Sequence, residues 1–379
     1  MPLNNRISLT SEKASQYQAV RRKLLLLRLV LTAVFLLAWL VSGASVGLKI
    51  RLLNIQENFF ALVALYFACF AVVSFVLSLP LEIYEEFFVE KRFGLSCQRA
   101  SSWLADLLKS GGVGFVVSLA ALEAIYYFLS QFPDTWWLWA AFFWFFLSIV
   151  MARIFPKLIL PLFFKVQPLP DGPLRQQLFN LFGRYRVRLK EIMVLDFSKK
   201  TVKANAMVSG LGATKQIFLA DTLLADFTPD EIASVLAHEL GHYLRHDTIK
   251  LVFLSLIGAL FSFGAAHLVF RALLPVFHLA APSDIAGLPL LLLILFAAGL
   301  LLLPLQNGFS RRLERQADLF ALEAANSPMA FMSMMTKLGQ KNLSDFEPPF
   351  WMEFFFYDHP SLTKRIELAR RFIRVGDHI

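Results

Sequence analysis

The feature that most constrains the fold of this chain is a series of apolar runs, each close to the length of a membrane crossing. Uncharged runs occupy residues 29–47, 59–81, 136–152, 251–270 and 288–305, and a sixth, 113–131, carries Glu123 as its one charge. A helix needs about 20 apolar residues to cross the hydrocarbon core of a bilayer. Only 17% of the chain is charged, against about 25% in soluble domains. The sequence therefore predicts a mainly α-helical, multi-pass membrane protein with six spans.

The positions of Lys and Arg predict how these spans are oriented. Basic residues gather at 21–28, before the first span, at 91–109, between the second and third, and in the polar regions after the fourth and sixth. Because positive residues mark the cytosolic side of a membrane, both termini and both large polar regions are expected in the cytosol. A bacterial inner membrane is the favoured location, and the endoplasmic reticulum membrane is the alternative.

The net charge of +9 does not indicate a nucleic-acid-binding protein. The sequence contains no basic patch interleaved with aromatic residues and no recognisable nucleic-acid-binding module. The topology and the attraction of basic loops to anionic lipid headgroups explain the charge. The expected partners are the lipid bilayer and a protein or peptide substrate.

Changes in composition divide the chain into four predicted parts. Residues 1–155 form a four-span membrane region with a cytosolic loop at 82–110, and 156–248 form a cytosolic lobe. Residues 249–306 form a transmembrane hairpin, and 307–379 form a second cytosolic region. Within the lobe, 191–198, 203–210 and 215–222 are typical of short strands. The last two are joined by the Gly-containing turn SGLGAT, so a small β-sheet is expected.

The run SVLAHELGHYLRHD, residues 234–247, concentrates three of the chain's seven histidines. Thr228 precedes Pro229 and stands three residues before Glu231, the pattern of a capping box that starts a helix. On that helix His238 and His242 are one turn apart and leave the same face. Two imidazoles in this arrangement suit Zn²⁺, and Glu239, rotated about 100° from His238, is placed to take a proton from a metal-activated water. We therefore expect one catalytic zinc ion with Glu239 as general base.

The third zinc ligand must come from elsewhere in the chain. His246 lies too far along the helix axis from His238, and the position six residues after His242, which is a histidine in metzincins, holds Thr248. Glu314, in the sequence LERQAD, is the best candidate, because it lies near the start of a cytosolic helix that is predicted to begin close to Asn307, after the transmembrane hairpin. Asp318, one turn further, is expected to accept the second N–H of a ligating histidine.

With these residues the sequence resembles the type I CAAX prenyl protease family of membrane-embedded zinc metallopeptidases. Besides HELGH and ERQAD, the resemblance includes YEEFFVEKRFG, PLPDGPL, NAMVSG, FLADTLL and DHPSLTKRIE, in family order from about residue 81 to 368. It implies a ring of transmembrane helices around a chamber, with a zincin-like cytosolic lobe that contains the small sheet. The family usually has seven spans, whereas this sequence predicts six.

The resemblance also implies roles for individual residues. His238, His242 and Glu314 would ligate zinc with Glu239 as base, Asn205 would hold the substrate backbone, and His359 would stabilise the tetrahedral oxyanion. Arg365 would brace the same region. The aromatic-rich segment 346–360 is interpreted as packing within the lobe, with an entrance for an apolar tail as the alternative.

Two substrate classes fit an integral-membrane zinc endopeptidase of this kind, prenylated CAAX C-termini and misfolded membrane proteins. A different class of function is a non-catalytic transporter or scaffold with a structural zinc site. In that case ionisable residues near the spans, such as Glu123, Arg153 and His267, would mark a permeation path. Glu239 discriminates the two classes, because a purely structural site does not need it.

Overall fold

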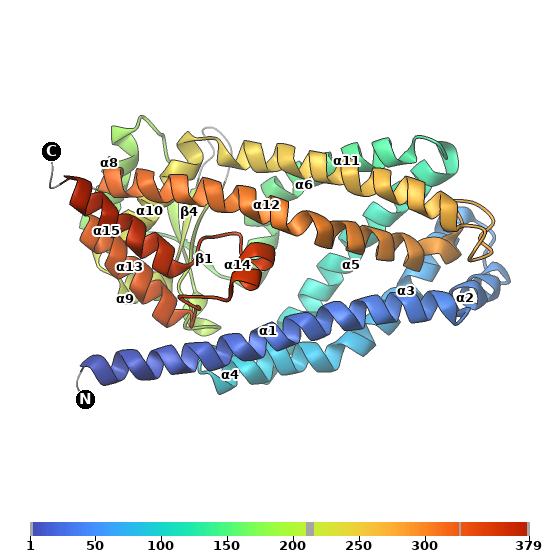
Figure 1. Cartoon of the computed structure of the whole chain (residues 1–379), viewed down its shortest axis with the longest axis horizontal. Helices are drawn as coiled ribbons and strands as arrows, with labels where there is room; N and C mark the ends of the chain where they lie inside the picture. Colours follow the sequence, from blue (N-terminus) through green and yellow to red (C-terminus); the bar gives the residue numbers. More distant parts are fainter. Residues whose placement is uncertain (1–2, 210–215, 326, 377–379) are drawn as a thin grey trace.

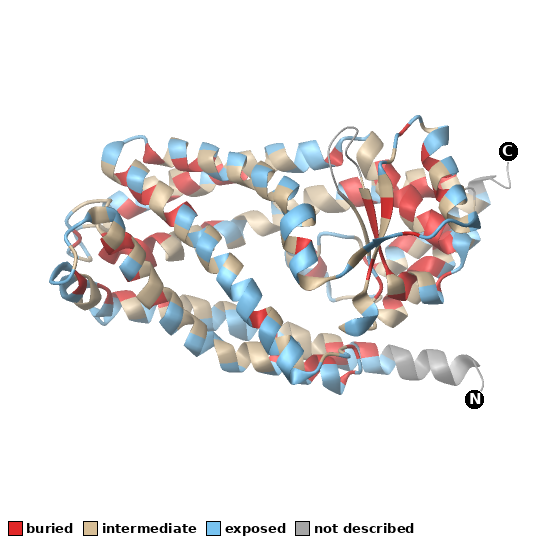
Figure 2. Ribbon diagram, turned by 180° about the vertical axis from the view of Figure 1, so that it is seen from behind, coloured by how far each residue is buried: buried red, intermediate tan, exposed pale blue. Residues whose placement is uncertain are grey.

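The fold is mainly helical, with one small sheet at one end of a set of long helices (Figure 1). The structure, a computed structural model, describes residues 3–209, 216–325 and 327–376. Within these ranges, six helical stretches are long and apolar enough to cross a membrane, which confirms the predicted number of spans. Figure 2 shows buried residues concentrated in the lobe, while the long helices are largely half-buried or exposed. Apolar helices with so little internal burial are those of a membrane protein, whose outer faces contact lipid.

The N-terminal half contains four of the six spans. Its helices are α1 (Leu3–Val41), α2 (Ala44–Leu53), α3 (Phe59–Glu82), the π-helical η1 (Ile83–Val89), α4 (Glu90–Arg92), α5 (Ala100–Gln131), α6 (Trp136–Ile154), the π-helical η2 (Phe155–Ile159) and α7 (Leu160–Phe163). The expected loop 82–110 is helical except for residues 93–99. The helices extend past the apolar runs because a helix satisfies its own backbone hydrogen bonds in lipid and in water alike.

The end of the spans away from the lobe is closed by a buried polar network. The Ser45 hydroxyl donates to the carbonyl of Ala286 at 2.6 Å and lies 2.5 Å from the Tyr66 hydroxyl. Trp39 Nε1 donates to the same Tyr66 oxygen at 3.2 Å. These bonds join α1, α2 and α3 to the short 3₁₀ helix η5 (Ile285–Gly287) that precedes α12.

The lobe is built on a four-stranded sheet in the order β1-β2-β4-β3. Its strands are β1 (Val166–Pro168), β2 (Glu191–Leu195), β3 (Ala206–Ser209) and β4 (Gln216–Ala220). β2 pairs with β4 in parallel, and the other pairs are antiparallel. The three predicted strands are therefore confirmed, while β1 was missed because it is only three residues long. The predicted hairpin turn SGLGAT, residues 209–214, lies outside the described residues from Gly210 on, and β3 is an edge strand.

Helices complete the lobe and connect it to the membrane region. They are α8 (Pro173–Arg184), the 3₁₀ helix η3 (Phe197–Lys199), α9 (Asp221–Asp226), α10 (Pro229–Leu244), α11 (Asp247–Leu273), α12 (Leu288–Ala325), α13 (Pro328–Lys341), α14 (Phe350–Phe356) and α15 (Leu362–Gly376). The lobe core packs α8 and α10 on the sheet through fully buried residues that include Leu178, Ile217 and Leu236.

One expectation about the second polar region is wrong. Glu314 was expected near the start of a separate cytosolic helix beginning close to Asn307, but α12 is a single helix that carries both the sixth span and Glu314. At 1.5 Å per residue a helix of this length reaches about 57 Å, well beyond the membrane core. Pro304 lies inside α12, and the helix continues through it. The sixth span and the candidate ligand therefore belong to one rigid element.

Candidate metal centre

The helix that carries the HELGH sequence begins where the sequence predicts. Thr228 is the N-cap of α10, Pro229 is its first residue, and Thr228 and Glu231 exchange both bonds of a capping box. The Thr228 hydroxyl accepts from the Glu231 amide at 3.3 Å, and the Glu231 carboxylate accepts from the Thr228 amide at 2.8 Å. This fixed start sets which face of α10 carries His238 and His242.

The glycine inside HELGH permits α10 to lie very close to α12. A Cβ atom at Gly241 would come within 3.1 Å of Phe320 Cδ1 and 3.2 Å of Ala317 Cα, both on α12. The second of these contacts is with backbone, which cannot move without shifting the whole helix. Gly241 thus allows the separation at which a side chain from α12 reaches the two histidines of α10.

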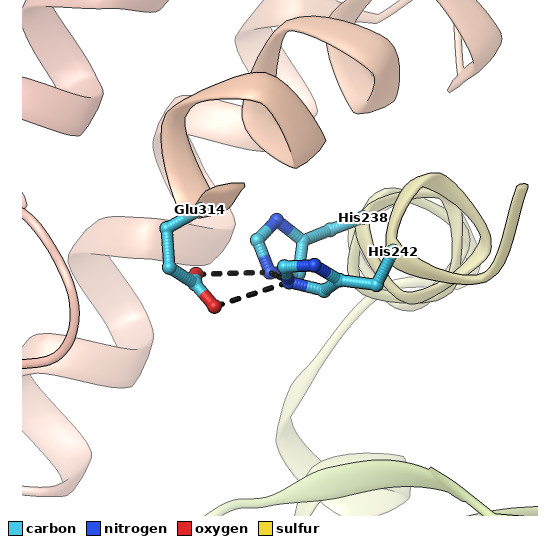
Figure 3. A group of neighbouring side chains, drawn as sticks. All are labelled: His238, His242 and Glu314. Carbon is cyan, nitrogen blue, oxygen red and sulfur yellow. Dashed lines mark hydrogen bonds and ion pairs between the residues drawn. The ribbon is translucent and has the colours of Figure 1, made fainter. Parts of the chain in front are cut away.

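Three ligand atoms converge between these helices (Figure 3). The Nε2 atoms of His238 and His242 are 3.1 Å apart. Glu314 Oε1 lies 3.1 Å from His242 Nε2, and Glu314 Oε2 lies 3.2 Å from His238 Nε2. Ligands about 2.0–2.1 Å from a tetrahedral ion lie about 3.3–3.4 Å from one another. The separations between neighbouring ligand atoms in this triangle of His238, His242 and Glu314, with one Glu314 oxygen facing each imidazole, are therefore close to those that one metal ion requires.

The hydrogen bonding around the triangle also fits a metal ion. Both imidazoles are bonded through Nδ1 to other carboxylates, so the Nε2 atoms that face each other are the free ligand atoms. Buried Glu314 Oε2 accepts no hydrogen bond from the residues that the structure describes, although His238 Nε2 lies 3.2 Å and an Nη atom of Arg365 lies 3.7 Å from it. When both imidazoles are neutral, their Nε2 lone pairs and the Glu314 carboxylate repel one another unless a cation lies between them. The donor set of two nitrogens and one oxygen is typical of a catalytic zinc site.

Carboxylates behind the ligands fix the histidine rings. Asp318 Oδ1 lies 2.9 Å from His238 Nδ1, and Asp247 Oδ2 lies 3.0 Å from His242 Nδ1. Arg365 in turn contacts both oxygens of Asp318, from Nε at 2.8 Å and from an Nη at 2.5 Å. The expected contact of Asp318 with His238 is present. Asp247 was missed, although its position directly after the helix was a usable signal.

The site has a strongly negative field. Burial by itself lowers the pKa of His238, but the carboxylates of Asp318 and Glu314 outweigh burial and raise that pKa to about 9. Burial also lowers the pKa of His242, but the hydrogen bond with the Glu314 carboxylate outweighs burial, so the pKa of His242 is raised as well. The carboxylates that stabilise an imidazolium here also stabilise a divalent cation once the imidazoles lose their protons.

Glu239 and His359 lie beside the triangle, whereas Asn205 and His246 lie outside it. Glu239 is half-buried, and its pKa is raised by burial, with the charges of His238 and His242 acting in the opposite direction. His359 Nε2 lies 3.3 Å from Glu314 Oε1, and its Nδ1 lies 2.6 Å from Asp358. His246 is exposed, as expected for a histidine that is not a ligand. Asn205 is exposed directly before edge strand β3, which packs against α10.

The aromatic-rich segment 346–360 leaves several aromatic side chains exposed, in addition to those that pack against the lobe. The exposed fractions of Phe350, Trp351 and Phe354 are 80%, 40% and 40%. The ring of Phe350 stacks on that of Phe354 with 5.8 Å between their centroids. Part of α14 therefore presents a free aromatic surface a few residues from His359.

Comparison with protein families finds two adjoining matches that together span nearly the whole chain. A model described as CAAX prenyl protease N-terminal, five membrane helices, matches residues 3–165. The model of peptidase family M48 matches residues 168–373. The first region contains four membrane-length helices here.

Individual proteins show the same similarity. The chain is 31% identical over 341 residues to a CAAX prenyl protease 1 homolog of Arabidopsis thaliana, covering 86% of this chain and 77% of that protein. It is 28% identical over 374 residues to an uncharacterized metalloprotease of Bacillus subtilis, covering 96% and 86%. The crystal structure of Ste24p from S. mikatae superposes with a TM-score of 0.85 at 24% identity, covering 95% and 89% of the two chains. That last likeness concerns the fold.

Replacement of Asp318 by Asn tests its contact with His238. Asn carries no charge and cannot accept from both His238 and Arg365 as a carboxylate does, so we expect the metal affinity to fall about 10- to 100-fold. Competition with a chelator measures this affinity. Glu323→Gln, an exposed position on the same helix, is the control and should bind metal as the wild type does. Equal affinity in the two variants would contradict the assigned role of Asp318.

Replacement of Gly241 by Ala tests the close packing of α10 on α12. Helix propensity alone favours Ala by about 1 kcal/mol, but the added Cβ must push against Ala317 and Phe320. We expect a lower thermal unfolding midpoint together with weaker metal binding. Gly183→Ala in α8, where a Cβ meets no atom within 4 Å, should leave both quantities unchanged or raise the midpoint. A Gly241→Ala protein as stable as the Gly183→Ala protein, with unchanged metal affinity, would show that the close approach is not needed.

Proposed function

The chain belongs to the CAAX prenyl protease group of peptidase family M48 and is a membrane-embedded metalloendopeptidase, and on this basis we propose that His238, His242 and Glu314 hold a catalytic zinc ion with Glu239 as general base. The observation that carries the proposal is the convergence of three ligand atoms beside a glutamate of the same helix. When bound, zinc supplies a Lewis acid and a water that ionises near neutral pH.

Glu239 is suited to move the proton in peptide hydrolysis. Burial raises the pKa of its carboxyl group, which brings its basicity closer to that required of a base at neutral pH. The carboxylate accepts a proton from the attacking water and delivers it to the leaving amine. General acid–base groups of this kind contribute about 10²- to 10⁴-fold to the rate.

His359 is suited to stabilise the negative oxygen of the tetrahedral intermediate. Asp358 accepts at Nδ1 and Glu314 lies near Nε2, so both ring nitrogens act as donors when the imidazole is protonated. With half of its side chain exposed, the ring remains accessible to a substrate. A donor aimed at developing charge lowers the barrier more than one aimed at the substrate itself.

Asn205 and β3 are suited to hold the substrate in an extended conformation. β3 is an edge strand next to α10, so one side of its backbone is available to pair with a peptide. Asn205 stands at the start of this edge with its side chain exposed. An extended substrate bound there passes close to the helix that carries His238 and Glu239.

The proposed location of the active site is the cytosolic side of the membrane. The lobe is formed by the two polar regions that follow the fourth and sixth spans. These regions, and the segments before the first span and between the second and third, carry the Lys and Arg residues that mark the cytosolic side. A bacterial inner membrane is the favoured membrane, and the endoplasmic reticulum membrane is the alternative.

Two substrate classes are consistent with this activity. Relatives named CAAX prenyl proteases favour peptides with a prenylated C-terminus, and misfolded membrane proteins are the second class. The exposed aromatic side chains of α14 supply an apolar surface near His359 that either class would use.

Replacement of Glu239 by Gln tests the mechanism directly. We expect peptide hydrolysis to fall about 10²- to 10⁴-fold while the metal content stays at the wild-type level, because Glu239 is not a ligand. The assay uses purified protein in detergent with a farnesylated CAAX peptide, the same peptide without the farnesyl group, and casein. Glu323→Gln serves as the active control.

The three substrates separate the two classes. Cleavage of the farnesylated peptide alone would identify a prenyl protease, whereas cleavage of casein or of both peptides would identify a quality-control protease. If the wild type and Glu239→Gln proteins retained their metal and cleaved any of the three at the same rate, the proposed catalytic role of Glu239 would be rejected.

A further inference from the structure

The placement of His359 raises a structural question that its own segment does not answer. Residues 357–361 have no helix or strand conformation, and α14 before them has only seven residues. Nevertheless His359 Nε2 lies 3.3 Å from a carboxylate oxygen of Glu314. A segment without regular structure needs external contacts to hold a side chain at such a distance.

The C-terminal end of α14 is held by side chains of α12. The last four carbonyl groups of a helix have no partner within the helix, and the capping residue Tyr357 is extended, with φ −98° and ψ 122°, rather than left-handed. An Nη atom of Arg311 donates to the carbonyl of Glu353 at 2.7 Å and to that of Tyr357 at 2.6 Å. Asn307 Nδ2 donates to the carbonyl of Phe355 at 2.6 Å. Bonds from a guanidinium to such carbonyls are stronger than neutral ones.

These anchors and the metal centre share one face of α12. Asn307, Arg311, Glu314 and Asp318 follow one another at intervals of four, three and four residues, which places them in a single stripe along a helix. Figure 1 shows α14 beside α12 in this region, in agreement with the contacts between the two helices. A single rigid helix therefore carries both the ligand Glu314 and the groups that fix the backbone next to His359.

We propose that Arg311 is a positioning residue for catalysis, which sets the distance between His359 and the metal centre by capping the C-terminus of α14. In the described part of the chain, the hydrogen bonds of Arg311 go to backbone carbonyls of Glu353, Phe354 and Tyr357, so it acts on His359 through the backbone. Asn307 is the second, weaker anchor of the same segment. This role deepens the proposed function and rests on it for the kinetic measurements below.

The main experiment replaces Arg311 by Gln and measures kcat, KM and metal content. A displacement of about 1 Å at a catalytic group costs on the order of 10²-fold in rate, so we expect kcat to fall by about that factor with little change in KM and none in metal content. Arg311→Lys keeps a cation that can reach the carbonyls and should restore part of kcat. Arg312→Gln, the exposed neighbouring arginine, is the matched control and should behave as the wild type.

A double-mutant cycle with His359→Ala distinguishes positioning from general stabilisation. If Arg311 acts through His359, Arg311→Gln should cost little further activity once His359 is absent. Losses that multiply instead would overturn the proposal, as would an unchanged kcat in Arg311→Gln. Should Arg311→Gln fail to fold, Asn307→Ala takes its place in the cycle, with a smaller expected loss of kcat. Losses of kcat from Asn307→Ala and His359→Ala that multiply would overturn the proposal in the same way.

Hydrogen–deuterium exchange gives a readout that does not need activity. Amides of residues 353–361 should exchange at least about tenfold faster in Arg311→Gln than in Arg312→Gln, while those of α10 stay protected. Unchanged exchange in this segment would overturn the proposal even if the wild type cleaved none of the peptides. An inactive wild type whose segment is loosened by Arg311→Gln would count against the proposed function and not against the anchoring by Arg311.

Discussion

The candidate metal centre depends on the close approach of α10 and α12 at Gly241. His238 and His242 lie on one helix and Glu314 on another, far apart in the sequence, and a carboxylate spans only a few ångströms beyond its backbone. The absence of a Cβ at Gly241 lets the backbone of α10 lie against Ala317 and Phe320. The same contact brings Asp318 behind His238. Without this packing the three ligand atoms would not meet at the separations observed.

The continuity of α12 connects this lobe to the membrane. One helix carries the sixth span, Asn307 and Arg311, which bond to the α14 segment, the candidate ligand Glu314 and the buried Asp318. Its lipid-facing part can be apolar because its backbone bonds are internal. At its lobe end the buried carboxylates of Glu314 and Asp318 both lie near the Arg365 guanidinium. Arg365 pairs with Asp318, and Asp247 pairs with both His242 and Lys250. Burying these charges is tolerable only in such pairs.

The sequence predicted those features that depend on local pattern. The six spans follow from apolar length, and the start of α10 follows from the order of Thr228, Pro229 and Glu231. The i, i+4 spacing of His238 and His242 also follows from the chain alone. For Glu314 the prediction needed topology and the family resemblance, because nothing in its local sequence specifies which helix lies opposite.

The features that were missed arise from packing between distant segments. Nothing in the sequence shows that Gly241 meets Ala317, or that Arg311 caps a helix some forty residues later. β1 is too short to have a period of its own, and its pairing with β2 decides its conformation. The continuation of α12 beyond the sixth span was misjudged because a change to polar residues was interpreted as a boundary, although a helix tolerates that change without a break.

The most direct test of the metal centre is X-ray absorption spectroscopy at the zinc edge on purified protein, with Glu314→Gln as the comparison. One zinc per chain, with two imidazole nitrogens at about 2.0–2.1 Å and a carboxylate oxygen at about 2.0–2.2 Å, is the expected result, and the Glu314→Gln protein should lose the carboxylate contribution. A metal bound without imidazole ligands, or a spectrum that Glu314→Gln leaves unchanged, would contradict the assembly of the site by α10 and α12.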